Sequence, residues 1–359
     1  MPLVRPDLAA LPSYVPGRNP ADLARELGLP EAVKLASNEV PYGPLPGVVE
    51  AIATAAGQAH RYPDMGVLAL RERLAERHGV DLARVATGCV SVALTEHLVK
   101  ATTFPGDEVI YAWRSFEAYP IIVAGSGATA VRVPNTADHR HDLPAMAAAV
   151  TDRTRVVFVC SPNNPTGTAV TRDELTTFLD AVPAETLVVL DEAYREFVTD
   201  PEVGDGLAIA AERPNVAVLR TLSKAWGLAG MRVGWLAAPP AVADAVRKVV
   251  TPFSVSGVAQ AAALAALEQE DEMRRRSAAV VEERDRVLDA VRALTPDVPD
   301  TQANFVWLPL GDGAAEFAAG CEKRGVIVRP FAGDGVRVTI GTPAENDLFL
   351  AVARTLLSR

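Results

Sequence analysis

Residues 215–235 read NVAVLRTLSKAWGLAGMRVGW, an apolar run of strand length followed by a turn that contains Ser and Gly. The turn carries Lys224, and Arg232 follows eight positions later. A lysine at the end of a buried strand is costly, because its ammonium group loses its contact with water. Lys224 is therefore either an ordinary loop lysine that extends to solvent or a residue whose amine is used in a pocket.

The pattern of strand and helix continues on both sides of this stretch. Between about residues 61 and 251, apolar runs of strand length alternate with helical patterns, which is typical of a parallel α/β sheet. The runs are DEVIYA, TAVRVP, RVVFVC, TLVVLD, NVAVLR and VGWLAA, which start at positions 107, 129, 155, 186, 215 and 233. We therefore predict an α/β fold in which helices cover both faces of a large, mostly parallel sheet.

The pattern changes from about residue 256 onward. A long amphipathic helical pattern over 272–294 precedes three short apolar runs, NFVWLPL, VIVRP and VRVTIG, and a last helical pattern over 345–357. This order predicts a smaller α+β domain at 256–359 beside a large domain at 31–255. The prolines of residues 1–30 predict an extended arm with few contacts to its own core, which packs with the small domain.

The composition argues against several classes of function. The 359 residues carry a net charge of −10, with Lys and Arg scattered among Asp and Glu, so no basic face for nucleic acid is expected. No apolar run approaches the roughly 20 residues of a membrane span, and the N-terminus has no signal-peptide pattern. Three widely separated cysteines are typical of a reducing compartment rather than of a disulfide framework. We expect a soluble, cytoplasmic protein with the size of an enzyme.

Polar residues directly follow three of the predicted strands. SPNNPTG follows RVVFVC, DEAY follows TLVVL, and TLSK follows NVAVLR. In open α/β sheets, ligands bind at the carboxyl ends of the strands, where these segments meet. The polar side chains delivered to this edge are Asn164, Asp191, Tyr194, Ser223 and Lys224. A buried carboxylate needs a cation, which could be Lys224, Arg232 or a protonated ring nitrogen of a ligand.

Pyridoxal phosphate is a ligand that fits all of these groups. Its aldehyde forms a Schiff base with a lysine amine, and burial beside a cation lowers the pKa of that lysine, here Lys224. Its protonated pyridine nitrogen needs a carboxylate, which Asp191 supplies. Its phenolic oxygen needs hydrogen-bond donors, which Asn164 and Tyr194 supply.

The phosphate group of the same cofactor needs an arginine, hydroxyl groups and backbone N–H groups at the start of a helix. The turn TGCVS at 87–91 precedes the helical run VALTEHLVKA and provides such a start. The predicted phosphate site consists of Arg232, Ser223, Thr221, Cys89, Val90 and Ser91.

Several of these stretches carry a resemblance to a known family. SPNNPTG, LDEAY and TLSKAWGLAGMRVGW resemble the signature blocks of pyridoxal-phosphate aminotransferases of the aspartate-aminotransferase fold type. KLASNEVPYGPLP, RYPDMG and VIVRPF resemble the branch that contains histidinol-phosphate and aromatic amino acid aminotransferases. GCVSVAL, WRSFEAYP and TPFSVSGVAQAAA are most similar to actinobacterial aromatic, or phenylalanine, aminotransferases. The resemblance covers nearly the whole chain, in order.

The resemblance implies further roles at single positions. Lys224 would also shuttle a proton during catalysis, with Asp191 and Tyr194 as the other catalytic residues. Phe116 would stack on the face of the cofactor ring. Tyr42 would reach the phosphate of the cofactor in a partner subunit, so the resemblance implies a homodimer with shared active sites, in which the N-terminal arm also packs with the partner.

The resemblance implies substrate contacts as well. Arg337 would bind the substrate carboxylate through two parallel hydrogen bonds, with Arg329 close by. Asn164 would contact the substrate, and Tyr14 in the N-terminal arm would help to close the pocket.

The sequence departs from the family pattern in two places. Cys89 and Val90 stand in the phosphate turn where many relatives have small and acidic residues, so backbone amides and Ser91 must serve there. Trp226 replaces the commoner Tyr or Phe after the lysine, and we expect this change to be neutral.

Each candidate residue has an ordinary structural explanation when it is taken alone. Asp191 could cap a helix, Asn164 could form a turn, and Phe116 could belong to the core. Arg329 and Arg337 could be surface residues of an edge strand. Their occurrence together, at the ends of successive strands, favours the cofactor site.

Two further motifs suggest other ligands. GSGATA at 125–130 fits the dinucleotide-binding pattern, but a strand-like run follows it where that fold needs a helix. DHRHD at 138–142 could bind a metal through His139 and His141, but it lies in a polar connection before Pro144. We predict neither a nicotinamide cofactor nor a metal.

The predicted function is an aminotransferase that moves the amino group of phenylalanine, tyrosine or tryptophan to 2-oxoglutarate. The alternative is a histidinol-phosphate aminotransferase, because two arginines could serve either a phosphate dianion or a carboxylate. A pyridoxal-phosphate lyase or decarboxylase would share the cofactor site and cleave another bond at the substrate α-carbon. A regulator with an aminotransferase-like domain is disfavoured, because we expect only an arm before KLASNE and no DNA-binding module.

Overall fold

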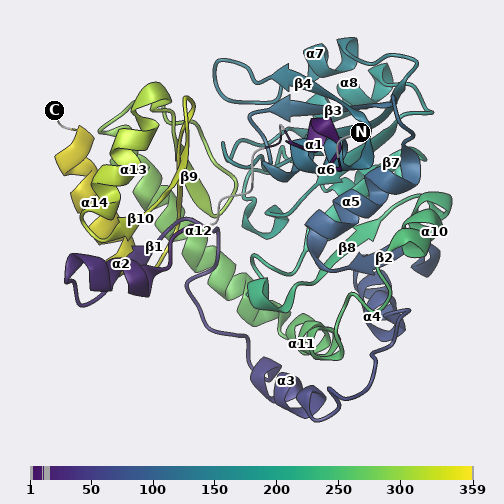
Figure 1. The fold of residues 1–359 in the computed structure, drawn as a ribbon, viewed down its shortest axis with the longest axis horizontal. Helices are drawn as coiled ribbons and strands as arrows, with labels where there is room; N and C mark the ends of the chain where they lie inside the picture. The colour runs from purple at the N-terminus through teal and green to yellow at the C-terminus, as the bar shows by residue number, and fades with distance from the viewer. Residues whose placement is uncertain (1–2, 10, 12–16, 358–359) are drawn as a thin grey trace.

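The computed structural model describes residues 3–9, 11 and 17–357, whose elements form two units (Figure 1). The larger unit is built on a seven-stranded sheet with the order β2-β8-β7-β6-β5-β3-β4. Its strands are β2 (Val85–Gly88), β3 (Glu108–Trp113), β4 (Thr129–Pro134), β5 (Thr154–Cys160), β6 (Leu187–Asp191), β7 (Val216–Thr221) and β8 (Gly234–Ala237). Neighbouring strands are parallel, except that β8 is antiparallel to both β2 and β7. The predicted α/β fold with a mostly parallel sheet is confirmed.

Helices cover both faces of this sheet, as predicted. One face carries α4 (Leu68–His78), α7 (Leu143–Ala148), α8 (Arg172–Ala181) and α9 (Gly206–Glu212), and the other carries α5 (Val90–Thr102), α6 (Ala118–Ser126) and α10 (Pro240–Val249). Side chains alternate between the two faces along a strand, so that in β3 Ile110 and Ala112 belong to one core while Val109 and Tyr111 belong to the other. Burial on both faces explains why the central strands β3, β5, β6 and β7 are largely apolar runs.

The smaller unit contains a three-stranded antiparallel sheet in the order β11-β12-β9. Its elements are α12 (Glu270–Arg292), β9 (Phe305–Leu308), α13 (Ala314–Glu322), β11 (Arg329–Phe331), β12 (Gly335–Thr339) and α14 (Pro343–Leu357). A second, two-stranded sheet pairs β10 (Val326–Ile327) in parallel with β1 (Val33–Lys34). A segment from near the start of the chain therefore lies beside the C-terminal strands (Figure 1).

The N-terminal segment is not extended throughout. Residues Pro20–Leu27 form helix α2, whose N-terminus is capped by the side chain of Asn19. Leu23 and Ala24 of this helix are buried in a cluster with Ile327 of β10. The expectation of few core contacts was wrong for this segment. A proline at the first helical position favours the start of a helix, and the helix formed here buries Leu23 and Ala24.

The remaining helices pack around the larger unit. α3 (Val48–Ala56) and α11 (Gly257–Leu267) pack on each other, and α11 also contacts α4 (Figure 1). α1 (Pro6–Ala9) lies on α6, where Arg5 donates hydrogen bonds to the backbone oxygens of Ala124 at 2.9 Å and Gly125 at 3.2 Å. Short 3-10 helices span Leu82–Arg84, Arg195–Phe197, Ala229–Met231 and Gly311–Gly313. Within the described ranges, no helix is both long and apolar enough to cross a membrane.

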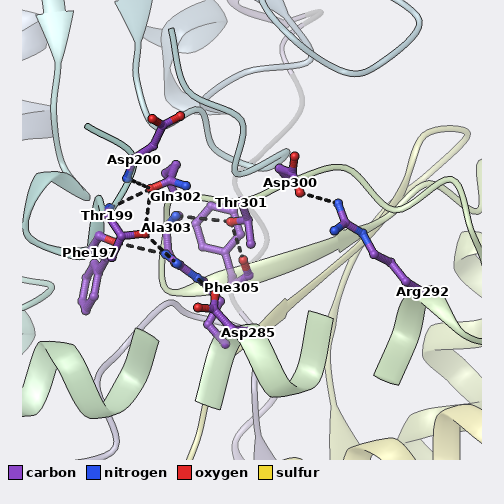
Figure 2. Close-up of polar contacts among 11 residues, drawn as sticks. Phe197, Thr199, Asp200, Asp285, Arg292, Asp300, Thr301, Gln302, Ala303 and Phe305 are labelled. Carbon is purple, nitrogen blue, oxygen red and sulfur yellow. Dashed lines mark hydrogen bonds and ion pairs between the residues drawn. The ribbon is translucent and has the colours of Figure 1, made fainter. Parts of the chain in front are cut away.

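A hydrogen-bond network joins α12 to the chain that follows β6 and to the chain that precedes β9 (Figure 2). Arg284 of α12 is 2% exposed and donates to the backbone oxygens of Phe197 at 3.0 Å and Ala303 at 3.4 Å. The side-chain oxygen of Gln302 accepts the backbone N–H groups of Thr199 at 2.8 Å and Asp200 at 3.1 Å. These contacts hold the two units together close to the carboxyl end of β6.

Replacing Arg284 with methionine is expected to lower the free energy of unfolding by about 2–4 kcal/mol, because two buried carbonyl groups lose their donor. Denaturant titration followed by circular dichroism measures this loss. The matched control is Arg286→Met on the same helix, where the exposed guanidinium pairs with Glu283 and Asp347 and its loss costs less than about 1 kcal/mol. Equal losses in the two variants would contradict the role assigned to Arg284.

Candidate active site

A cavity of about 540 Å³ opens at the carboxyl ends of β5, β6 and β7. The predicted site residues in its wall are Val90, Ser91, Phe116, Asn164, Asp191, Tyr194, Thr221, Ser223, Lys224, Arg232 and Arg337. Most of them belong to the larger unit, and Arg337 comes from β12 of the smaller unit. The cavity therefore lies between the two units.

Three of the predicted residues that the structure describes do not line this cavity. Cys89 is the half-buried residue before α5 and does not line the cavity. Tyr42 lines an adjacent cavity. Arg329 is paired with Glu117 at 2.8 Å. Tyr14 falls outside the described residues.

Asp191 ends β6 and is 4% exposed. Its Oδ2 accepts a hydrogen bond from the hydroxyl of Tyr119 at 2.8 Å, whereas its buried Oδ1 has no hydrogen-bond partner among the residues that the structure describes. Burial raises the pKa of Asp191 to about 6; the Tyr119 hydrogen bond and the N–H of Ala193 oppose this rise, and the charge of Glu192 adds to it. A buried carboxylate oxygen without a partner is costly unless a cation binds it.

Lys224 lies in the turn after β7 and is half-buried. Its Nζ donates a hydrogen bond to the backbone oxygen of Ser37 at 3.2 Å. Burial and the positive charges of Arg337 and Arg232 lower the pKa of Lys224 to about 7, against the opposing charge of Glu39. At neutral pH a large share of Lys224 is therefore the uncharged amine, which is the nucleophilic form.

Hydrogen bonds connect the other polar residues of the wall. The side-chain amide of Asn38 donates to the hydroxyl of Tyr194 at 2.9 Å. Arg337 donates through Nη1 to Oδ1 of Asn164 at 2.5 Å and through Nη2 to the backbone oxygen of Ala36 at 2.6 Å. This network links β12 to the segment after β5 across the cavity.

The turn between β2 and α5 has an unusual backbone. Val90 has a φ of 71°, which β-branched residues rarely adopt. β8 packs directly against this turn, since a Cβ on Gly234 would lie 2.3 Å from the backbone nitrogen of Ser91. On the same wall, the hydroxyl of Ser223 is buried without a hydrogen-bond partner among the described residues, and Arg232 is exposed. A helix start, a hydroxyl group and a guanidinium suit a bound phosphate.

These features fit pyridoxal phosphate group by group. The unpartnered oxygen of Asp191 can accept the proton of a ring nitrogen, and the amine of Lys224 can react with an aldehyde. Arg232, Ser223 and the start of α5 can hold the phosphate.

The described part of the chain contains no cluster of three or more His, Cys, Asp or Glu side chains arranged to hold a metal ion.

The two motifs that suggested other ligands do not line this cavity. Residues 125–130 join the end of α6 to the start of β4, with Gly127 in the left-handed conformation, so the glycines precede a strand. The His139 ring packs edge-on against Trp307 with 6.4 Å between the ring centroids. His141 is buried, and burial lowers its pKa to about 4, so it is uncharged at neutral pH.

Sequence reasoning missed several residues at or behind the cavity wall, among them Ser37, Asn38, Tyr119 and Cys160. Ser37 contributes its backbone oxygen, which no side-chain pattern reveals. Asn38 has a φ of 53°, which asparagine tolerates better than most residues, and this preference was an available signal. Tyr119 lies in a helical run and gave no signal of its contact with Asp191.

Comparison with known proteins agrees with the geometry of the site. The family model for aminotransferase class I and II matches residues 30–352. A protein of Streptomyces avermitilis named aromatic amino acid aminotransferase is 58% identical over 351 residues, which are 98% of this chain and 96% of that protein. A protein of the same name from Rhodococcus jostii is 55% identical over 358 residues, which are 100% of this chain and 97% of that protein.

A solved structure supports the same conclusion. The crystal structure of histidinol-phosphate aminotransferase from Sinorhizobium meliloti, in complex with pyridoxal-5'-phosphate, superposes with a TM-score of 0.87. The two chains are 30% identical, and the match covers 99% of each. This chain therefore belongs to the aminotransferase class I and II family and is a pyridoxal-phosphate-dependent aminotransferase.

Proposed function

We propose that this aminotransferase transfers the amino group of phenylalanine, tyrosine or tryptophan to 2-oxoglutarate, with pyridoxal phosphate bound at the carboxyl ends of β5 to β7. The observation that carries the proposal is that one cavity contains both the amine of Lys224, with its lowered pKa, and the unpartnered oxygen of Asp191. Relatives that are 51–58% identical and named aromatic amino acid aminotransferase support the substrate class.

The cofactor is held by residues at three of its edges. Bound pyridoxal phosphate supplies an electron sink that eases removal of the α-proton of an amino acid. Asp191 keeps the proton on the ring nitrogen, and Asn164 and Tyr194 hydrogen-bond to the phenolic oxygen. Phe116, which lines the cavity, would pack on the ring face. The phosphate is held by Arg232, Ser223, Thr221, Ser91 and the backbone at Cys89 and Val90.

Lys224 is the residue that moves protons. With the cofactor bound, Nζ of Lys224 would hold the aldehyde and, as a free amine, would accept the proton of the substrate α-carbon. A pKa of about 7 suits this role, because the free amine is then available near neutral pH.

The substrate is recognised by a guanidinium and an apolar wall. Arg337 binds the α-carboxylate through its two outer nitrogens. The cavity wall also contains Val92, Ile121 and Ile122, which suit an aromatic side chain. Arg329 is already paired with the carboxylate of Glu117. The negative charge of Glu117 would repel a substrate phosphate dianion bound next to Arg329. We therefore favour aromatic amino acids over histidinol phosphate.

Steady-state kinetics with 2-oxoglutarate as the acceptor tests the substrate class. We expect kcat/KM for phenylalanine to exceed that for histidinol phosphate by about tenfold or more, because a hydrophobic pocket discriminates by this order. Equal values, or a preference for histidinol phosphate, would contradict the aromatic assignment. Glutamate should form in equal amount to the aromatic keto acid, whereas release of carbon dioxide would indicate a decarboxylase.

Burial, and to a smaller extent the charge of Arg337, are expected to set the pH at which Lys224 reacts. In the cofactor-free protein, the rate of covalent capture of pyridoxal phosphate should rise with pH and reach half its maximum near pH 7, because only the uncharged amine reacts. In Arg337→Met one source of the lowered pKa is lost, so the pKa of Lys224 rises and the midpoint moves to higher pH. Stopped-flow absorbance measures the rate.

Arg329→Met is the control for this shift. Arg329 lies on β11, beside the strand β12 that carries Arg337. Its guanidinium is not among the charges that lower the pKa of Lys224. In Arg329→Met, the pH at which the capture rate reaches half its maximum should equal that of the unchanged protein. An unshifted midpoint in Arg337→Met would contradict the assigned electrostatics.

We also propose a homodimer in which Tyr42 reaches the cofactor phosphate of the partner. The side chain of Tyr42 is partly exposed and lies outside the cofactor cavity of its own chain, which supports a role across an interface. Sedimentation analysis should give twice the chain mass, and Tyr42→Phe should weaken cofactor binding without changing that mass. A monomeric holoenzyme would contradict the proposal.

A further inference from the structure

We propose that Tyr119 is a positioning residue for the cofactor, because its hydroxyl holds Asp191 so that the second carboxylate oxygen is directed at the ring nitrogen. The inference rests on the proposed function, since it takes pyridoxal phosphate to bind in this cavity. Tyr119 does not line the cavity, and it acts through Asp191.

The two oxygens of Asp191 have different surroundings. Oδ2 accepts the hydroxyl of Tyr119 at 2.8 Å, and Oδ1 has no hydrogen-bond partner within the described part of the chain. Tyr119 is 0% exposed and Asp191 is 4% exposed, so water does not replace this bond. A carboxylate fixed at one oxygen presents the other in a defined direction.

Packing fixes the ring of Tyr119. It stacks on Phe158 of β5 with 4.8 Å between centroids and 16° between planes. It also meets the edge of Phe116 at 5.5 Å and 88°. The hydroxyl direction is therefore set by the contact of α6 with the sheet, and the same ring supports Phe116, which is proposed to lie over the cofactor.

The ionisable groups around this hydrogen bond stay uncharged. Burial and the neighbouring carboxylate of Asp191 raise the pKa of Tyr119 well above its ordinary value, so Tyr119 remains a donor. Burial also raises the pKa of the Cys160 thiol and of the Tyr194 hydroxyl, which both adjoin Asp191. None of the three carries a negative charge near neutral pH that would oppose ionisation of Asp191.

Among the residues that the structure describes, the negative charge that raises the pKa of Asp191 belongs to its chain neighbour Glu192. Glu192 is paired with buried Arg220 at 2.7 Å, and Arg220 also contacts Asp205 at 2.8 Å. Burial and the charge of Glu192 both raise the pKa of Asp191 and so disfavour its ionised form. The hydrogen bond from Tyr119 opposes both effects and favours the ionised form. An ionised Asp191 is the form that binds a protonated ring nitrogen.

Tyr119→Phe removes this hydroxyl and keeps the ring. The dissociation constant of pyridoxal phosphate is measured by equilibrium dialysis of the cofactor-free protein between about pH 5.5 and 9, a range that spans protonation of a carboxyl of raised pKa. In the unchanged protein, affinity should fall as the pH drops through about 6, where Asp191 takes up its proton. In Tyr119→Phe this fall should begin about one pH unit higher, so that binding weakens about twofold at pH 7 and approaches a tenfold loss near pH 5.5.

Tyr111→Phe is the matched control. Tyr111 is also fully buried, its ring lies 5.6 Å from that of Tyr119, and its hydroxyl accepts a hydrogen bond from Arg132 at 3.2 Å instead of contacting Asp191. Its pH profile should match that of the unchanged protein. Circular dichroism and thermal melting compare the folding of both variants.

A double-variant cycle separates positioning from a general structural effect. In an Asp191→Asn background, Tyr119→Phe should no longer shift the pH profile, because there is no carboxylate to orient. The inference would be overturned if Tyr119→Phe weakened cofactor binding by the same factor at every pH, or if Tyr111→Phe shifted the pH profile of binding as much as Tyr119→Phe does. Absence of cofactor binding by the unchanged protein would instead overturn the proposed function.

Discussion

Replacement of Lys224 by glutamine is expected to lower kcat for transamination by about 10⁴-fold or more, while the protein still folds. An amide neither bonds covalently to the cofactor aldehyde nor accepts the α-proton of the substrate. Folding should be preserved because burial destabilises the ammonium of Lys224, as its lowered pKa indicates. The cofactor-free variant should therefore be no less stable to denaturant than the unchanged protein.

Initial rates measured with phenylalanine and 2-oxoglutarate test this expectation. Lys34→Gln is the control, because Lys34 lines the adjacent cavity and pairs with Glu39 at 3.2 Å but does not line the cofactor cavity. It should keep most of its turnover. A Lys224→Gln enzyme that turns over within about tenfold of the unchanged protein would remove Lys224 from the mechanism.

Asp191→Asn is expected to lower kcat/KM by about 10²–10³-fold, because a neutral amide does not keep the ring nitrogen of the cofactor protonated. The same change should weaken cofactor binding, which equilibrium dialysis measures. Asp191→Glu retains the negative charge and is expected to lose less activity when cofactor saturates the protein. Full activity of Asp191→Asn would show that this carboxylate is not the partner of the ring nitrogen.

The run predicted at 129–134 coincides with β4, although most of this strand is exposed. The predicted runs at 155–160 and 186–191 differ from β5 and β6 by one residue at the start. β2 was not predicted, because the sequence VATG is short and contains Ala and Gly, which are depleted in strands. Helix α2 was missed because its segment follows several prolines, although Asn19 and the proline after it are a recognisable helix start.

The site could be predicted where a side chain follows an apolar run. Asp191 and Lys224 each lie at such a position, and the parallel order of β6 and β7 brings both to one edge. Ser37 and Tyr119 could not be predicted in this way. Ser37 acts through its backbone oxygen, and the contact of Tyr119 with Asp191 depends on how α6 packs on the sheet, which no local pattern records.

Borohydride reduction after incubation with pyridoxal phosphate, followed by proteolysis and mass spectrometry, tests most directly whether Lys224 holds the cofactor. We predict a single stable modification per chain, on the peptide that contains Lys224. No incorporation, or labelling spread over Lys34, Lys100, Lys248 and Lys323, the other lysines of the chain, would contradict the assignment.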